Sequence, residues 1–236
     1  MTKGWIFDYG GTIDTDGCHW GKKIWHAYEA LQVKVGEDAY REAYVNAERV
    51  ISSAHLVKPD FTFEKTLRLK LRLQLEYLCT QGHWDADSEQ FERIHAEMTD
   101  LLYAQTKSTV AQNRLVIDAI GRHFPLVVVS NFYGNLQTVL REFQLDSLFE
   151  AVVESAQVRI RKPDPRLFSL GIKALKMNPE EVVVIGDSFY KDIEPAKRLG
   201  CKTVWLKGEG WTSVDYDTTF PTYTIDTLSQ ILRLPL

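Results

Sequence analysis

Four short apolar runs constrain the fold of this chain more than any other feature of its sequence. Each is rich in β-branched or aromatic residues: Trp5–Phe7, Leu126–Val129, Val182–Ile185 and Thr203–Leu206. Continuous runs of this length are typical of strands buried on both faces of a parallel sheet. Between them, apolar residues recur at helical spacing within 136–143, 167–175 and 193–199. Strands that alternate with helices predict an α/β fold with a doubly wound parallel sheet and right-handed crossovers.

The stretch from Cys18 to about Thr106 has a different composition. It is rich in Ala, Glu, Leu, Arg and Tyr and holds a single proline, Pro59. We expect four helices there, near residues 21–32, 37–54, 63–79 and 87–105. Asp87 or Ser88 supplies an N-cap for the last helix. The chain is therefore divided into an α/β core, residues 1–16 and 107–236, and an all-helical insert, residues 17–106.

One segment of the insert carries two conflicting signals. Every second residue from Leu67 to Leu75 is leucine, and this alternation favours a strand. All residues from Leu67 to Glu76 are good helix formers, however, none is β-branched, and the run is long for a strand. We predict a helix.

Composition and charge exclude several classes of protein. The chain has 236 residues, 44% hydrophobic and 25% charged, as ordinary globular proteins do. Its formal net charge of -4 provides no general basic field, so we expect no nucleic-acid partner. Apolar runs stay well short of the roughly 18 residues needed to cross a bilayer, and Met1–Tyr9 lacks the features of a secretory leader. We therefore expect no membrane partner and a cytoplasmic location. The three isolated cysteines give no support to a disulfide framework or a zinc site.

Polar residues follow the predicted strands at the positions where open α/β sheets bind ligands. Asp8 comes directly after the first apolar run, and Ser130 follows the second. Gly186 and Asp187 follow the third, and Lys162 precedes a predicted helix. Each residue alone is equally typical of a turn, a helix cap or a solvated loop. Together they offer a carboxylate, a hydroxyl, an ammonium and a second carboxylate along one edge of the sheet.

In this order, the motifs resemble those of the haloacid dehalogenase (HAD) superfamily of hydrolases. Asp8 with Thr12 matches the first motif, and Ser130 matches the second. Lys162 matches the third. The fourth motif consists of Gly186, Asp187 and Asp192. The helical insert lies where members with a type-one cap carry theirs, so the resemblance implies a Rossmann-like core with an inserted helical cap.

The resemblance also implies a covalent mechanism and a metal. Asp8 would be the nucleophile that forms an aspartyl-phosphate, which divides one difficult displacement into two easier ones. Mg²⁺, which prefers oxygen ligands, would be held by the carboxylates of Asp8 and Asp187, the main-chain carbonyl of Gly10 and water.

The remaining motif residues would bind and orient the phosphoryl group. Ser130, Asn131 and Lys162 would contact its oxygens, and Lys162 would also serve as a catalytic cation. Asp192 and Thr12 would lie behind these groups, with Asp192 orienting Lys162 or a metal-bound water. The resemblance thus implies a hydrolase of small phosphorylated metabolites; the oligomeric state is not predicted.

One position departs from the family pattern. Phosphatases of this family usually carry a second Asp two residues after the nucleophile, as general acid and base, whereas here that position is Gly10. Such a group contributes about 10² to 10⁴ in rate. A first hypothesis is that another residue of the same segment replaces it, and the candidates are Asp14, Asp16 and His19.

A second hypothesis places the chain in the phosphonatase or dehalogenase branches, which lack the second Asp. Dehalogenases work without metal, yet Asp187 and Asp192 are retained; phosphonatases need a cap lysine, and the available ones are Lys22, Lys23, Lys58 and Lys65. A third hypothesis is that the chain binds phosphorylated ligands or partners with little turnover. Four aromatic residues flank the motifs, where they would shape a substrate entrance or seal the cap: Tyr9, Trp20, Phe132 and Tyr133.

Overall fold

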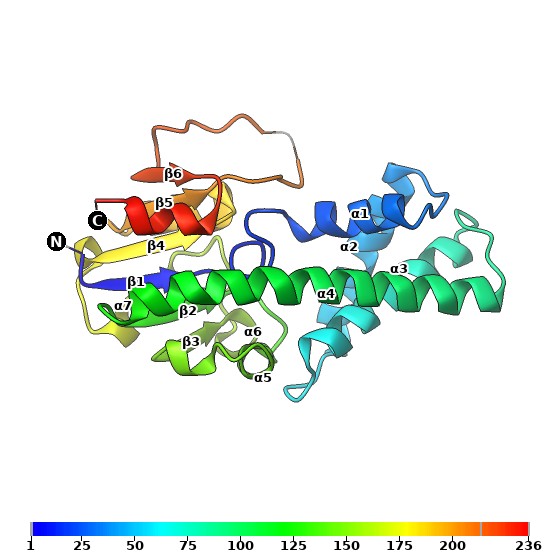
Figure 1. Cartoon of the computed structure of the whole chain (residues 1–236), viewed down its shortest axis with the longest axis horizontal. Helices are drawn as coiled ribbons and strands as arrows, with labels where there is room; N and C mark the ends of the chain where they lie inside the picture. The colour runs from blue at the N-terminus through cyan, green and yellow to red at the C-terminus, as the bar shows by residue number, and fades with distance from the viewer. Residues whose placement is uncertain (1, 213, 236) are drawn as a thin grey trace.

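A six-stranded parallel sheet lies at the centre of the α/β half of the molecule (Figure 1). The computed structural model describes residues 2–212 and 214–235. The strand order is β3-β2-β1-β4-β5-β6, and every neighbouring pair is parallel. The strands are β1 (Gly4–Phe7), β2 (Leu126–Ser130), β3 (Ala151–Glu154), β4 (Val182–Gly186), β5 (Lys202–Leu206) and β6 (Tyr223–Ile225). The predicted α/β class and all four predicted strands are confirmed.

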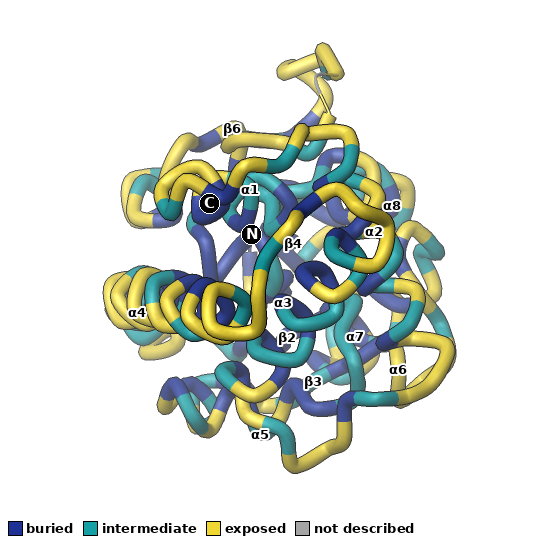
Figure 2. The backbone as a smooth tube through the Cα atoms, turned by 90° about the vertical axis from the view of Figure 1, so that its right-hand side faces the viewer, coloured by how far each residue is buried: buried dark blue, intermediate teal, exposed yellow. Residues whose placement is uncertain are grey.

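The apolar runs form strands because both of their faces are covered. In β1, Trp5 and Phe7 face one hydrophobic core, which also holds residues of α4 (Ser88–Gly121). Ile6 faces a second core, shared with α7 (Arg166–Leu175). Figure 2 shows the buried strands inside the molecule and the exposed outer side of α4.

Two strands were not predicted, and both lie at the edges of the sheet. β3 contributes two fully buried residues of its four, and β6 is three residues long and partly exposed. Edge strands are covered less completely than central ones, so their sequences carry a weaker apolar signal.

The insert between β1 and β2 is helical, as predicted. It consists of α1 (Trp20–Ala30), α2 (Glu37–Ser53), α3 (Phe63–Thr80) and the first part of α4. The leucine-rich segment is part of α3, so the helix prediction is confirmed over the strand periodicity. Leu67, Leu71 and Leu75 lie on the buried side of this helix, whereas Leu69 and Leu73 are only partly buried. None of the helices in the described ranges combines the length and the apolar character needed to span a bilayer.

The fourth helix of the insert is longer than predicted. Asp87 caps it as expected, because its carboxylate accepts a hydrogen bond of 2.8 Å from the main-chain N–H of Gln90. The helix then continues to Gly121 as a single element of 34 residues and packs against both the insert and the sheet side (Figure 1). No glycine or proline interrupts it before Gly121, which explains why it does not end near Gln105. The division after residue 106 therefore falls within a continuous helix and stays a prediction.

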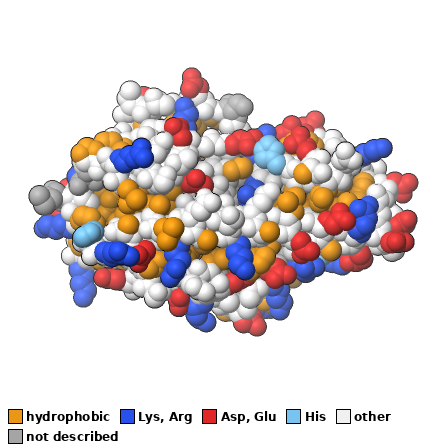
Figure 3. Space-filling model, in the orientation of Figure 1, with side chains coloured by type: hydrophobic (Ala, Val, Ile, Leu, Met, Phe, Trp, Pro, Cys, Tyr) orange, Lys and Arg blue, Asp and Glu red, His pale blue; other side chains and the backbone are white. Residues whose placement is uncertain are grey.

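The remaining helical elements lie between the strands of the core or, in the case of the last one, after β6. They are α5 (Leu136–Glu142), α6 (Ser155–Val158), α8 (Glu194–Arg198), a π-helical turn at Phe189–Ile193, and 3₁₀ turns at Asp146–Leu148, Pro179–Glu181 and Leu228–Arg233. The helix predicted over 193–199 is thus shorter than expected and follows the π-helical turn. On the face seen in Figure 3, acidic and basic side chains are interspersed over both halves of the molecule.

Candidate active site

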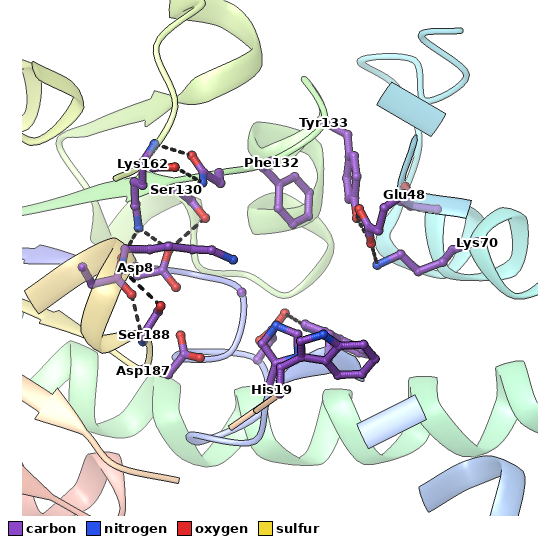
Figure 4. A pocket seen from close by; sticks show the side chains of 18 of the residues that line it. Asp8, His19, Glu48, Lys70, Ser130, Phe132, Tyr133, Lys162, Asp187 and Ser188 are labelled. Carbon is purple, nitrogen blue, oxygen red and sulfur yellow. Dashed lines mark hydrogen bonds and ion pairs between the residues drawn. The ribbon is translucent and has the colours of Figure 1, made fainter. Parts of the chain in front are cut away.

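The carboxylate of Asp8 is the point at which the predicted site residues meet. Its Oδ1 atom accepts hydrogen bonds from Lys162 Nζ at 2.6 Å and Ser130 Oγ at 3.1 Å (Figure 4). Its Oδ2 atom accepts one from Thr12 Oγ1 at 3.1 Å. Asp8 follows β1, and Ser130 is the last residue of β2. Because parallel strands end at the same edge, segments far apart in the sequence converge here.

Lys162 is buried between two carboxylates. Its ammonium lies 2.6 Å from both Asp8 Oδ1 and Asp192 Oδ1, and its side chain is 2% exposed. Burial alone would lower the pKa of Lys162, but the charges of Asp192 and Asp8 outweigh it and raise the pKa, so the group stays an ammonium. The main-chain N–H of Ser188 donates to the other oxygen of Asp192 at 3.0 Å, so both oxygens of that carboxylate are engaged.

The side chain of Asn131 fixes the segment that carries Lys162. Its Nδ2 donates to the carbonyl of Lys162 at 3.1 Å, and its Oδ1 accepts from the N–H of Lys162 at 2.9 Å. Asn131 also borders the pocket. Its predicted contact with phosphate stays a prediction.

Three carboxylates gather around the single ammonium of Lys162. Oxygen atoms of Asp8, Asp187 and Asp192 lie within 4.8 Å of one another. Burial, with the charges of Asp192 and Asp8, raises the pKa of Asp187 well above its usual range, and burial raises the pKa of Asp192 to about 6. This excess of negative charge and the hard oxygen donors fit a divalent cation such as Mg²⁺.

Thr12 and Gly11 hold Asp187 in place beside Asp8. The hydroxyl of Thr12 lies 3.2 Å from Asp187 Oδ1 and accepts a hydrogen bond of 3.0 Å from the N–H of Asp187. Gly11 has φ +97°, and a Cβ there would lie 2.5 Å from the Asp187 carboxyl group. Only glycine therefore fits this turn without displacing the carboxylate.

Gly10 borders the same pocket and leaves room for a side chain. A Cβ added at Gly10 would meet no atom within 4 Å. The packing around residue 10 would therefore accommodate an aspartate in place of Gly10.

The three candidate replacements for the missing acid differ in where they lie. Asp14 borders the pocket, and its oxygens accept hydrogen bonds from the N–H of Gly11 at 2.7 Å and the indole of Trp20 at 2.8 Å. Burial raises its pKa to about 7 despite these bonds. Asp16 instead bonds the N–H of Leu228 at 2.8 Å and does not line the pocket.

His19 lines the pocket as a neutral imidazole. Its Nδ1 caps α1 by accepting a hydrogen bond of 3.0 Å from the N–H of Gly21. Burial, together with the charges of Lys191 and Lys70, lowers its pKa to about 4.

The pocket extends from Asp8 to the helical insert and encloses about 340 Å³. The insert contributes residues that the sequence did not single out: Tyr44, Glu48, Phe63, Thr66, Leu67 and Lys70. Of the four aromatic residues noted beside the motifs, Trp20, Phe132 and Tyr133 line this pocket, whereas Tyr9 is fully buried.

The pocket wall contains a lysine of the insert, Lys70, that the sequence did not single out. The four lysines considered for a phosphonatase do not line the pocket: Lys22, Lys23, Lys58 and Lys65. In the sequence, Lys70 resembles an ordinary solvated helix residue, so only the packing of α3 reveals it.

One lining residue comes from the segment after β5 and inserts between helices of the insert. The ring of Trp211 lies 5.0 Å from that of Tyr44, and the Arg41 guanidinium lies 4.3 Å above it. Arg41 also donates to the Trp211 carbonyl at 3.1 Å. A Cβ on Gly21 would lie 2.0 Å from the indole, so the glycine makes room for it.

The fold and the pocket define a class of protein: a parallel α/β sheet with a carboxylate cluster at its strand ends and a helical insert above it. The model of the family described as haloacid dehalogenase-like hydrolase matches residues 50–206. The chain therefore belongs to the haloacid dehalogenase-like hydrolases, as its motifs predict.

Known proteins support this assignment. A glyceraldehyde 3-phosphate phosphatase of Pyrococcus furiosus is 36% identical over 99 residues, which are 42% of this chain and 41% of the relative. A phosphoserine phosphatase of Thermus thermophilus is 41% identical over 106 residues, 44% of this chain and 40% of the relative. The chain thus aligns with about two fifths of the length of each relative. A dehalogenase crystallised with an intermediate complex has the same fold, with a TM-score of 0.62 and 16% identity over 98% of this chain and 96% of that one.

Proposed function

We propose that this chain is a Mg²⁺-dependent phosphohydrolase of small phosphorylated metabolites that acts through an aspartyl-phosphate. The observation that carries the proposal is the Asp8 carboxylate, which Lys162, Ser130 and Thr12 hold at the strand ends within one pocket. The phosphatase names of the two aligned relatives support the same reaction class.

The reaction would proceed in two displacements at phosphorus. An oxygen of Asp8 forms a bond to phosphorus while the bond to the leaving alcohol oxygen breaks, and that oxygen takes up a proton. Water then attacks the phosphorus of the aspartyl-phosphate, loses a proton and releases inorganic phosphate and free Asp8. Lys162 and Ser130 supply the positive charge and hydrogen bonding that the phosphoryl oxygens need.

The metal would be held by the carboxylates of Asp8 and Asp187 and the main-chain carbonyl of Gly10. When bound, Mg²⁺ neutralises negative charge on the phosphoryl group and on its carboxylate ligands. Asp192, which accepts hydrogen bonds from Lys162 and from the N–H of Ser188, would orient Lys162.

Asp14 is the best-placed residue to carry the proton that Gly10 cannot. It lies in the pocket, and burial raises its pKa to about 7, close to the value that suits a general acid and base near neutral pH. Asp16 lies outside the pocket, and burial lowers the pKa of His19 to about 4, so its imidazole is neutral and a poor proton donor near neutral pH.

The phosphonatase interpretation is disfavoured by the state of Lys70. A lysine that forms a Schiff base must lose its proton, which requires a lowered pKa. Burial would lower the pKa of Lys70, but the nearby Glu48, Tyr133 and Tyr44 outweigh it and raise the pKa well above its usual range.

The test is phosphate release from a panel of phosphorylated metabolites and p-nitrophenyl phosphate, with Mg²⁺ and with EDTA. We expect turnover that needs Mg²⁺ and that Asp8→Asn reduces by about 10⁴-fold or more. Asp16→Asn is the matched control, because Asp16 lies on the same segment but outside the pocket. Ligand binding without turnover by the wild-type protein would support a binding role instead, and full activity of Asp8→Asn would refute the proposed nucleophile.

A further inference from the structure

A second polar cluster lies at the end of the pocket away from Asp8, with Phe132 between the two (Figure 4). The ammonium of Lys70, on α3, forms an ion pair with Glu48 Oε1, on α2. The hydroxyl of Tyr133, which follows β2, lies 3.0 Å from each oxygen of the Glu48 carboxylate. We call Glu48, Lys70 and Tyr133 the cap triad.

The cap triad is partly buried and retains hydrogen-bonding capacity. The Lys70 side chain is 9% exposed and that of Glu48 26%. An ammonium has three donors, and within the described residues Glu48 is the single carboxylate that Lys70 pairs with. A carboxylate offers about four acceptor positions, more than Lys70 and Tyr133 use. Donors and acceptors therefore remain side by side at the wall of the pocket.

The charge balance of the cap triad selects among leaving groups. A carboxylate on the substrate would compete with Glu48 for Lys70 and be repelled by Glu48. An ammonium on the substrate would compete with Lys70 for Glu48 and be repelled by Lys70. A hydroxyl group donates to Glu48 and accepts from Lys70 without adding a charge. Arg161 and Lys191 also border the pocket, and both are exposed; despite the burial of Glu48, the charges of Lys70 and Arg161 lower the pKa of its carboxyl.

Aromatic rings surround the cap triad. The ammonium of Lys70 lies 5.1 Å from the ring centroid of Tyr44 and 5.6 Å from that of Tyr133. The Trp211 ring packs against Tyr44, and Phe132 stands between the triad and Asp8. Apolar walls with a few polar groups at one place are typical of sites that bind a small molecule in one orientation.

We propose that the cap triad is the subsite for the hydroxyl groups of the leaving alcohol, so that the substrates are phosphate monoesters of uncharged polyhydroxy compounds such as sugars. This inference rests on the proposed phosphohydrolase function. Glu48, Lys70 and Tyr133 determine specificity in this scheme and take no part in the bond changes at phosphorus.

The test compares glucose 6-phosphate with n-hexyl phosphate, which has a similar leaving group without the hydroxyls. We expect the wild-type protein to favour glucose 6-phosphate by at least about tenfold in kcat/KM, since buried polar groups left unpaired cost affinity. The double variant Glu48→Gln/Lys70→Met should reduce this ratio by about 10- to 100-fold. Both partners are changed together because a single change would leave a buried charge unpaired. Lys65→Met, an exposed lysine on the same helix, should keep the wild-type ratio.

Two further measurements keep the outcomes distinct. Tyr133→Phe removes one hydroxyl and should lower the ratio by about three- to tenfold, which tests the triad if the double variant fails to fold. Calorimetric binding of both phosphates to the Asp8→Asn protein gives the same comparison without turnover. Equal values for the two phosphates, a preference for phosphoglycolate or phosphoserine, or an unchanged ratio in the variants would overturn the subsite. Loss of turnover on every phosphate with the binding preference retained would count against the proposed hydrolysis alone.

Discussion

The two ends of the pocket differ in how they balance charge. At the sheet end, Asp8, Asp187 and Asp192 surround one ammonium, that of Lys162. At the insert end, the carboxylate of Glu48 meets a single ammonium and a hydroxyl. The sheet end is therefore incomplete without further positive charge, whereas the cap triad is already neutral. The difference fits the proposed division of roles, in which the first end would bind a cation and a phosphoryl group and the second would distinguish uncharged groups on the substrate.

The largest effect should come from exchanging one buried lysine at each end. Lys162→Met removes the only cation beside Asp8 among the described residues, and we expect kcat/KM for p-nitrophenyl phosphate to fall by about 10³-fold or more. Each change leaves a carboxylate without its ion-pair partner and should lower stability, but Lys70→Met should spare the turnover of this substrate. A loss of about 3 kcal/mol in the free energy of unfolding is expected, largely restored by adding Glu48→Gln. Denaturant titration measures the loss of stability, and steady-state kinetics measures the loss of turnover. An equal loss of turnover in both variants would contradict the proposed difference between the two ends of the pocket.

The pH dependence of stability should reveal the buried carboxyl group of Asp14 beside the sheet end of the pocket. Burial raises the pKa of Asp14 from 3.8 to about 7, so the folded state holds this proton over a range in which the unfolded state has lost it. The free energy of unfolding should therefore fall as pH rises from about 4 to about 7. Asp14→Asn lacks this titrating group, so its free energy of unfolding should rise relative to that of the wild type by up to about 4 kcal/mol across that range. Parallel pH profiles of the two proteins would contradict the buried, protonated carboxyl group.

A smaller effect is expected when the family carboxylate is restored at Gly10. A Cβ there meets no neighbour within 4 Å, so Gly10→Asp should fold and place an acid beside the leaving group. Turnover of an alkyl phosphate should rise by about tenfold, less than the full contribution of a general acid because Asp14 already supplies part of it. Gly10→Ala is the control for the side chain without the carboxyl. No gain with Gly10→Asp, in a protein that still binds Mg²⁺, would favour a binding function.

Much of the sheet end could be predicted from the sequence, because three of its residues lie at the ends of buried strands. Asp8, Ser130 and Asp187 lie at the ends of apolar runs, and parallel strands bring such positions to one edge whatever the length of chain between them. Lys162 could be placed near them only through the family resemblance, since its segment follows no strand directly.

The insert end could not be predicted, because it depends on how helices pack. Glu48 and Lys70 lie on different helices, and nothing in the spacing of their sequence specifies which faces of α2 and α3 meet. Tyr133 was noted only as a neighbour of the second motif. The full length of α4 was likewise missed, because no helix-breaking residue marks the passage from insert to core.

The insertion of Trp211 gives the molecule a natural optical reporter. Its indole belongs to the segment after β5 yet rests against Tyr44 and beneath the Arg41 guanidinium of the insert. Any separation of the insert from the sheet half that admits a ligand must withdraw this ring from its cationic neighbour and expose it to water. Because the chain has six tryptophans, the part of the emission change and of its quenching by iodide that is lost in Trp211→Phe would follow substrate entry, without an attached dye.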